Sequence, residues 1–190
     1  MNWEQVDSLL KLHIQAKPKL ENGLEDIRNL LSKDNNQLII ENINLSNLKS
    51  EFFQYLENAF KWNPIPNNIK SIYFGLFTMD DNGKKVTTLY LSGSITTPFK
   101  DTLDWNVDPA YFPKYYFVPN DFITINETYP KLSGDQEVLV FNGIVNLLII
   151  NTIREFEKYL LKKQNVIFLG AGFDSGDTYV LGQLTKEGLK

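Results

Sequence analysis

The sequence predicts an α+β fold, with a mainly antiparallel sheet built from two hairpins and packed against N-terminal helices and one long central helix. Apolar residues recur at helical spacing over residues 2–61 and 135–163, whereas residues 69–94 and 166–184 are rich in strand-forming side chains. No βαβ unit is repeated, which favours antiparallel pairing. A chain of 190 residues with 43% hydrophobic content can bury one substantial core. We therefore expect a single globular domain over residues 1–190.

Two helices are expected at the start of the chain. Asn2 and Gln5 have the spacing of a capping box, which marks the beginning of the first helix. Pro18 interrupts the helical pattern, because proline lacks the backbone N–H that a helix interior requires. A second helix is expected from about Leu20 to Leu31.

A short strand and a third helix follow. The turn-forming residues 34–36 precede residues 37–43, which we interpret as a short strand. Ser46 or Ser50 is expected to cap the third helix, which runs to about Lys61.

The middle of the chain predicts a hairpin and then an irregular segment. Residues 69–79 and 84–94 have strand character, and the intervening Asp80-Asp81-Asn82-Gly83 is a strong turn sequence. Residues 96–130 contain five prolines and no sustained period, so we expect one or two short helices at most. Long irregular segments in compact domains are often functional.

One long helix, from about residue 135 to 163, is expected to be the centre of the core. Ser133 and Gln136 form a second possible capping box, and Gly143 marks either the true start of the helix or a kink. The apolar run 138–153 is interrupted by polar residues and is too short for a membrane span of about 20 residues. We therefore expect a buried helix and no membrane partner.

The second hairpin is expected at the C-terminal end. Residues 166–169 are interpreted as a buried strand, residues 170–176 as a glycine-rich turn, and residues 178–184 as the closing strand.

Acidic and aromatic residues are concentrated in residues 101–137. The net charge of the chain is −4, yet residues 101–150 alone carry a net −5 and the remaining residues +1. An acidic, aromatic-rich loop is suited to a basic protein partner and repels the phosphates of nucleic acid. The alternative is an acidic face that serves solubility alone.

Several kinds of reaction centre are disfavoured by the sequence. There is no cysteine, which excludes disulfides, Cys-based zinc sites and thiol nucleophiles. The single histidine, His13, is expected to pack within the first helix. Gly170-Ala171-Gly172 lacks the third glycine and the following helix of a dinucleotide site, and Asp80–Gly83 lacks the later ligands of a calcium loop. We therefore expect no cofactor.

Two alternative functions remain open at this point. Asp101, Asp104 and Asp108 could meet Asp174 and Asp177, and clustered carboxylates can bind Mg²⁺ or act as an acid/base pair. This arrangement would make the protein a carboxylate-based hydrolase or a metal-dependent enzyme. The other alternative is a structural module whose exposed aromatic residues form a homo-oligomer contact.

Five short segments together resemble a group of small bacterial proteins. The segments are Phe74–Phe77, Leu89–Ser94, Asp104-Trp105, Tyr111–Pro113 and Gly172–Asp177. The group accompanies secreted polymorphic or contact-dependent toxins, and its members are thought to act as immunity proteins. The resemblance covers about residues 70–184. It implies a cytoplasmic, non-enzymatic inhibitor that binds one cognate toxin, and it supplies no catalytic residues.

The residues expected to contact a protein partner are carboxylates and aromatic side chains from the central and C-terminal loops. Trp105 and Tyr111 are the expected anchors, although Trp105 is equally consistent with a core position. Carboxylates are expected to accelerate association. The candidate residues are Asp101, Asp104, Trp105, Asp108, Tyr111, Asp174 and Asp177.

Overall fold

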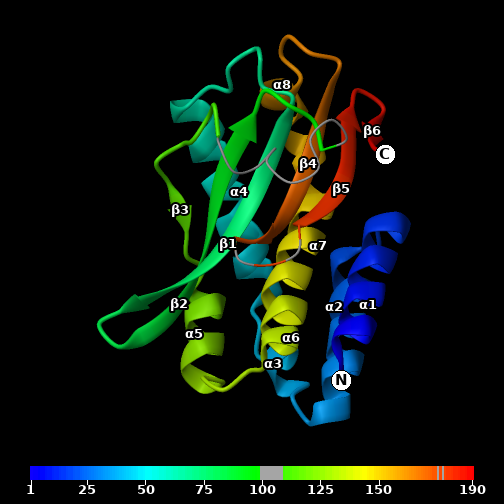
Figure 1. The fold of residues 1–190 in the computed structure, drawn as a ribbon, viewed down its shortest axis with the longest axis vertical. Helices are drawn as coiled ribbons and strands as arrows, with labels where there is room; N and C mark the ends of the chain where they lie inside the picture. The colour runs from blue at the N-terminus through cyan, green and yellow to red at the C-terminus, as the bar shows by residue number, and fades with distance from the viewer. Residues whose placement is uncertain (99–108, 175, 177) are drawn as a thin grey trace.

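The fold is a six-stranded sheet with helices packed on one face (Figure 1). The computed structural model describes residues 1–98, 109–174, 176 and 178–190. The helices are α1 (Trp3–Ala16), α2 (Leu20–Leu31), α3 (Leu38–Glu41), α4 (Leu45–Trp62), α5 (Asn120–Thr128), α6 (Gly134–Glu137), α7 (Gly143–Thr152) and α8 (Glu157–Leu160). The strands are β1 (Ser71–Asp81), β2 (Lys84–Ser94), β3 (Tyr116–Phe117), β4 (Val166–Phe173), β5 (Thr178–Thr185) and β6 (Gly188–Leu189).

The sheet confirms the predicted fold class and adds one pairing that was not predicted. Its strand order is β3-β2-β1-β4-β5-β6. Neighbouring strands are antiparallel except β1 and β4, which are parallel. A parallel pair needs a long crossover, and here the chain between β2 and β4 supplies it. The sheet is therefore mixed, although four of its five pairings are antiparallel.

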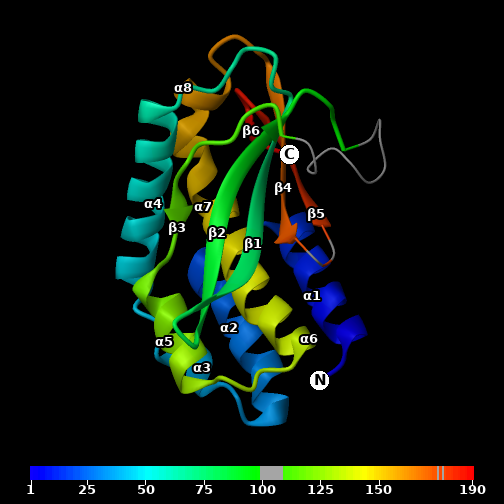
Figure 2. The ribbon, with the colours of Figure 1, turned by 60° about the vertical axis from the view of Figure 1, so that its left-hand side comes forward.

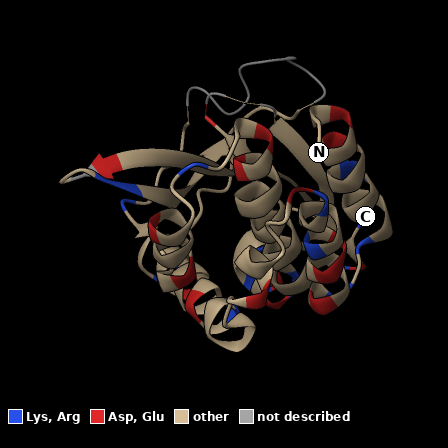
Figure 3. Cartoon of the chain, turned by 90° about the horizontal axis from the view of Figure 1, so that it is seen from below, with Lys and Arg blue, Asp and Glu red and all other residues tan. Residues whose placement is uncertain are grey.

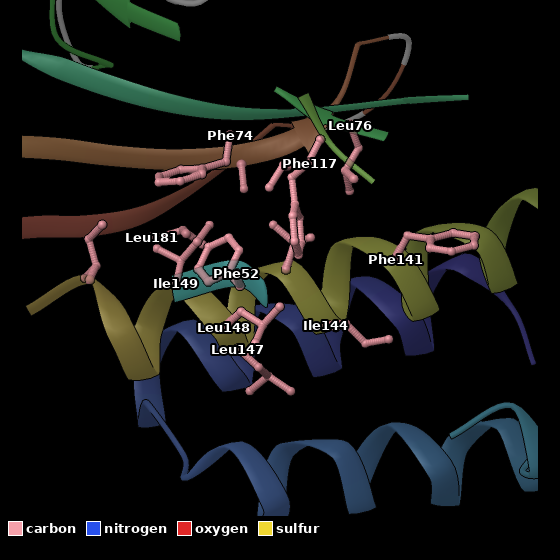
Figure 4. Packing of buried hydrophobic residues seen from close by; sticks show 14 of the residues in the cluster. Phe52, Phe74, Leu76, Phe117, Phe141, Ile144, Leu147, Leu148, Ile149 and Leu181 are labelled. Atoms are coloured by element: carbon pink, nitrogen blue, oxygen red, sulfur yellow. The ribbon is translucent and has the colours of Figure 1, made fainter. Parts of the chain in front are cut away.

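The central helix runs from Gly134 to Leu160 and lies between the sheet and α2 (Figure 4). It is continuous through α6, a π-helical segment at Val138–Asn142, α7, a 3₁₀ segment at Ile153–Phe156 and α8. It is long and apolar enough to cross a membrane, but 78% of its most apolar window is buried inside the fold. That burial agrees with the predicted role of a core helix.

Close packing of the central helix depends on a glycine. The π-helical segment ends immediately before Gly143, so the expected irregularity lies at that position. A Cβ atom on Gly143 would lie 2.9 Å from Cδ1 of Ile27 in α2, which is closer than real Cβ contacts allow. A methyl group at this position would therefore require the end of the Ile27 side chain to shift.

Both predicted capping boxes are present, at Asn2/Gln5 and at Ser133/Gln136. The cap of α4 differs from the prediction, because Asn44 accepts the hydrogen bond from the backbone N–H of Asn47. Asparagine is as good an N-cap residue as serine, and it begins the helix at Leu45.

Two other predictions were wrong in part. Residues 38–41, expected within a strand, form the short helix α3, in which the consecutive residues Ile39 and Ile40 are both buried. A half-buried strand would bury alternate residues instead. Residues 170–173, expected in a glycine-rich turn, belong to β4, because they pair with β1 through Gly75↔Gly172.

The turn of the first hairpin has the predicted chemistry. Asn82 and Gly83 have φ angles of 55° and 84°, and two positive φ angles are characteristic of the type I′ turn. Asp80 accepts a hydrogen bond of 2.7 Å from the backbone N–H of Gly83. The register that follows places Gly75 opposite Tyr90.

We expect Gly83→Ala to destabilise the protein by about 1 kcal/mol, because a Cβ atom disfavours the left-handed backbone conformation. A Cβ atom at Gly83 would contact nothing within 4 Å, so the effect is purely conformational. Gly134→Ala is the matched control, since its Cβ would also meet nothing within 4 Å and Gly134 lies in a helix without positive φ. Urea denaturation measures both. Equal stabilities for the two variants would contradict the prediction.

Candidate protein-binding surface

The structure places two of the seven residues expected to bind a partner. Tyr111 and Asp174 are described, and the others remain predictions. Those that lie outside the described residues are Asp101, Asp104, Trp105, Asp108 and Asp177.

Tyr111, expected as an exposed anchor, is instead only 7% exposed. Its hydroxyl donates a 2.6 Å hydrogen bond to the backbone carbonyl of Asn63, just after α4. Its backbone pairs with Gly93 in β2 through hydrogen bonds of 2.8 and 3.0 Å. Burial of an aromatic ring whose hydroxyl needs a partner explains this position. Tyr111 therefore has a structural role, in which it links β2 to the chain that follows α4.

Asp174 lies at the end of β4 and is held by two hydrogen bonds. Its backbone N–H donates to the carbonyl of Leu76 at 2.9 Å, and its carboxylate accepts from the Tyr90 hydroxyl at 2.5 Å. The Tyr90 side chain starts on β2 and reaches over β1 to make this contact. Asp174 is therefore ordered by an aromatic residue two strands away.

A glycine creates the path that the Tyr90 ring takes. Gly75 lies opposite Tyr90 in the hairpin, and a Cβ atom on Gly75 would overlap the Tyr90 ring. Phe74 and Leu76 point toward the helices (Figure 4). Because successive side chains of a strand point to opposite faces, Gly75 and the Tyr90 ring lie on the other face. No helix of the described residues covers this face, and we call it the helix-free face.

Aromatic rings surround Tyr90 on the helix-free face. The Tyr90 centroid is 6.2 Å from that of Tyr73, 6.1 Å from that of Phe77 and 5.6 Å from that of Phe112. Phe77 is in turn 5.6 Å from Tyr116 of β3, in an edge-to-face arrangement. These separations are typical of favourable aromatic pairs. We call these five residues the aromatic cluster.

The described carboxylates of residues 109–137 lie away from this cluster, on α5 and α6. Glu127 forms a 2.6 Å ion pair with Lys84, and Glu137 lies 3.4 Å from Lys85, both at the tip of the first hairpin. Asp and Glu are spread over several helices and mixed with Lys and Arg (Figure 3). The described carboxylates of this segment therefore do not gather around the aromatic cluster, and Asp121 lies instead beside the start of α4, where it accepts a hydrogen bond from the backbone N–H of Asn44.

Large exposed rings gather between β3 and α4. The exposed fractions are 55% for Tyr116, 45% for Tyr115 and 65% for Trp62. Trp62, at the end of α4, was not among the predicted site residues. It lies seven residues after the buried Tyr55, at the margin of the apolar stripe of the helix, and helical periodicity is the signal that could have identified it.

A groove of about 480 Å³ separates α4 from β3. Phe117 of β3 forms its base by packing on Tyr55 and Phe52 of α4, at centroid distances of 5.3 and 5.5 Å. The two elements lie side by side in both ribbon views (Figures 1 and 2). The lining residues are Glu51, Gln54, Tyr55, Asn58, Trp62, Tyr115, Tyr116, Phe117 and Val118. We call this the α4–β3 groove.

The described residues do not bring together a metal-binding group of three or more His, Asp and Glu side chains. His13 is almost fully buried, and its Nε2 lies 3.2 Å from a carboxylate oxygen of Asp26. This contact joins α1 to α2, which agrees with the predicted packing role. The features that remain for recognition are the aromatic cluster and the adjoining α4–β3 groove, which share Tyr116.

Comparison with protein-family models, with curated proteins and with solved structures gives no match.

We expect Gly75→Ala to destabilise the protein by about 1–3 kcal/mol, because the added methyl group displaces the Tyr90 ring from a packed position. In the double variant with Tyr90→Ala the overlap disappears. The loss of unfolding free energy in the double variant should therefore be smaller than the sum of the losses in the two single variants. Urea denaturation of the three variants measures this coupling. Strictly additive losses would show that the two residues are not in contact.

We expect stability to fall as the pH rises above about 10, the ordinary pKa of tyrosine. Burial raises the pKa values of Tyr55, Tyr90 and Tyr111, and the hydrogen bond to Asp174 adds to the shift of Tyr90. Above that pH the unfolded chain loses these protons before the folded chain does, which favours unfolding. Tyr55→Phe or Tyr90→Phe should make the decline less steep in urea titrations. An unchanged slope in both variants would exclude this cause.

Proposed function

We propose that the protein is a non-enzymatic protein-binding module that acts as an immunity-type inhibitor of a bacterial toxin. The observation that supports binding is the group of exposed rings at the α4–β3 groove, Trp62, Tyr115 and Tyr116. Tryptophan and tyrosine are enriched among the residues that dominate binding energy at protein interfaces. A contiguous exposed group of such rings marks an interaction surface.

The segments that carry the resemblance to immunity proteins support the same proposal. Their described members meet around one side chain, Tyr90, which lies over Gly75, packs near Phe112 and donates to Asp174. These residues come from four separate segments of the chain. The described residues of the segments that carry the resemblance therefore lie together on the helix-free face, next to the exposed Tyr116.

The rigidity of the surface also favours inhibition by tight binding. Phe117 is packed against α4, and the Tyr111 hydroxyl is bonded to the chain just after α4. A surface that is already ordered loses little conformational entropy when a partner binds. Asp101, Asp104, Trp105 and Asp108 remain predicted contributors to the same interface.

We expect Trp62→Ala and Tyr116→Ala each to weaken binding of the cognate toxin at least about 30-fold, the effect of removing a central interface ring. The proposed partner is the C-terminal domain of a large secreted protein encoded beside this gene. Isothermal titration calorimetry with this domain measures the affinity. Leu12→Ala is the control, because Leu12 is also an exposed apolar residue but lies on α1, away from the groove.

Absence of a complex with the neighbouring toxin domain would contradict the immunity proposal. Equal affinities for all three variants would contradict the proposed surface. Sedimentation at several concentrations separates a further case: self-association that Tyr116→Ala abolishes would assign the rings to a homo-oligomer contact instead.

A further inference from the structure

We propose that the α4–β3 groove binds an extended, polyproline II-like segment of the protein partner, with a basic side chain of that segment directed toward Glu51. This inference rests on the proposed function and deepens it by naming the chemistry of the bound segment. The groove and its lining, the chain on either side of β3 and the unpaired charge of Glu51 each contribute to it.

The lining of the groove combines aromatic rings with polar side chains. Tyr55, Trp62, Tyr115 and Tyr116 supply rings, while Gln54 and Asn58 supply side-chain amides from the exposed face of α4. Aromatic-lined grooves with hydrogen-bond donors are the usual docking sites of polyproline II segments, whose backbone carbonyls have no internal partners. The side-chain amides of Gln54 and Asn58 can donate hydrogen bonds to the backbone carbonyls of such a segment.

The size of the groove sets the length of the segment. From Glu51 to Trp62 the helix rises about 16 Å, at about 1.5 Å per residue. A polyproline II segment rises about 3.1 Å per residue, so about five residues fit along this wall.

The chain on either side of β3 is poorly suited to extending that strand toward a partner. The backbone N–H of Tyr115 donates to the carbonyl of Pro113 at 2.8 Å, and its own carbonyl accepts from the Tyr55 hydroxyl at 3.5 Å. Pro113 and Pro119 flank the strand on either side, and proline cannot extend a hydrogen-bonded ladder. Recognition by side chains is therefore favoured over strand addition.

The negative charge of Glu51, at one end of the groove, favours binding of a cation there. Among the described residues that line the groove, Glu51 is the only charged one. Its Oε1 accepts 2.9 Å hydrogen bonds from the side-chain amides of Asn47 and Asn120. Its Oε2 is buried and has no hydrogen-bond partner. Among the described residues, no Lys or Arg forms an ion pair with Glu51.

Asp121 adds to the negative potential near Glu51. One of its carboxylate oxygens accepts a 3.1 Å hydrogen bond from the backbone N–H of Asn44, and the other has no partner. Burial raises the pKa of the Asp121 carboxyl, and the charge of Glu51 adds to that shift although the bond from Asn44 opposes it. A basic side chain in the groove would relieve this like-charge pair.

The test is titration of the full chain with synthetic ten-residue peptides, followed by NMR through the indole N–H of Trp62. We expect saturable shifts with a proline-rich peptide that carries one arginine. An otherwise identical peptide with glutamate in place of arginine, and a valine- and threonine-rich peptide of equal charge, should not bind. Glu51→Gln should weaken binding about 10-fold and flatten its dependence on salt. Leu12→Ala should leave the affinity unchanged.

Three results would overturn the inference. Binding of the valine- and threonine-rich peptide alone would indicate strand addition. Equal binding of the arginine and glutamate peptides would remove the role of Glu51. No binding of any peptide, in a protein that still binds its toxin through Trp62 and Tyr116, would reject the bound segment and leave the proposed function intact.

Discussion

The burial of one apolar helix is the constraint on which the rest of the structure depends. The central helix has buried residues on every side over α7, so it needs cover from the sheet as well as from α1 and α2. That burial outweighs the cost of two amide side chains, Asn142 and Asn146, which are buried without hydrogen-bond partners. Each such group costs about 1–3 kcal/mol. The layered arrangement follows, because a sheet on one side and helices on the other enclose the helix completely.

Within the described part of the chain, this arrangement leaves the other face of the sheet without helices, and aromatic rings cover part of that face. Tyr90 can lie across β1 only because Gly75 has no side chain. Its hydroxyl then reaches Asp174 at the end of β4. The ring thus ties together the antiparallel hairpin and the strand that pairs in parallel with it. Among the described residues, aromatic packing and the hydrogen bond from Tyr90 to Asp174 both contribute to order at the helix-free face.

Features determined by a few neighbouring residues were predictable from the sequence, whereas features determined by distant pairing were not. The capping boxes and the Asn82-Gly83 turn are local, and they were predicted correctly. The two-residue turn also fixes the register that places Gly75 opposite Tyr90, so the sequence of the turn is sufficient to predict this pairing. The parallel β1–β4 pair joins residues 97 positions apart in the sequence, such as Ser71 and Phe168, and no local pattern encodes it. The α4–β3 groove was missed for the same reason, since its walls are brought together only by folding.

The two walls of the groove are held by contacts that lie beneath it rather than within it. Phe117 packs on Tyr55 and Phe52, and Tyr111 bonds to the backbone of Asn63 at the end of α4. These supporting contacts are buried, whereas Trp62, Tyr115 and Tyr116 keep large exposed fractions at the rim of the groove. A partner that occupies the groove then meets walls fixed in advance, and little ordering entropy is lost on binding. The division between buried supporting rings and exposed contacting rings explains why aromatic residues so close in sequence have opposite exposure.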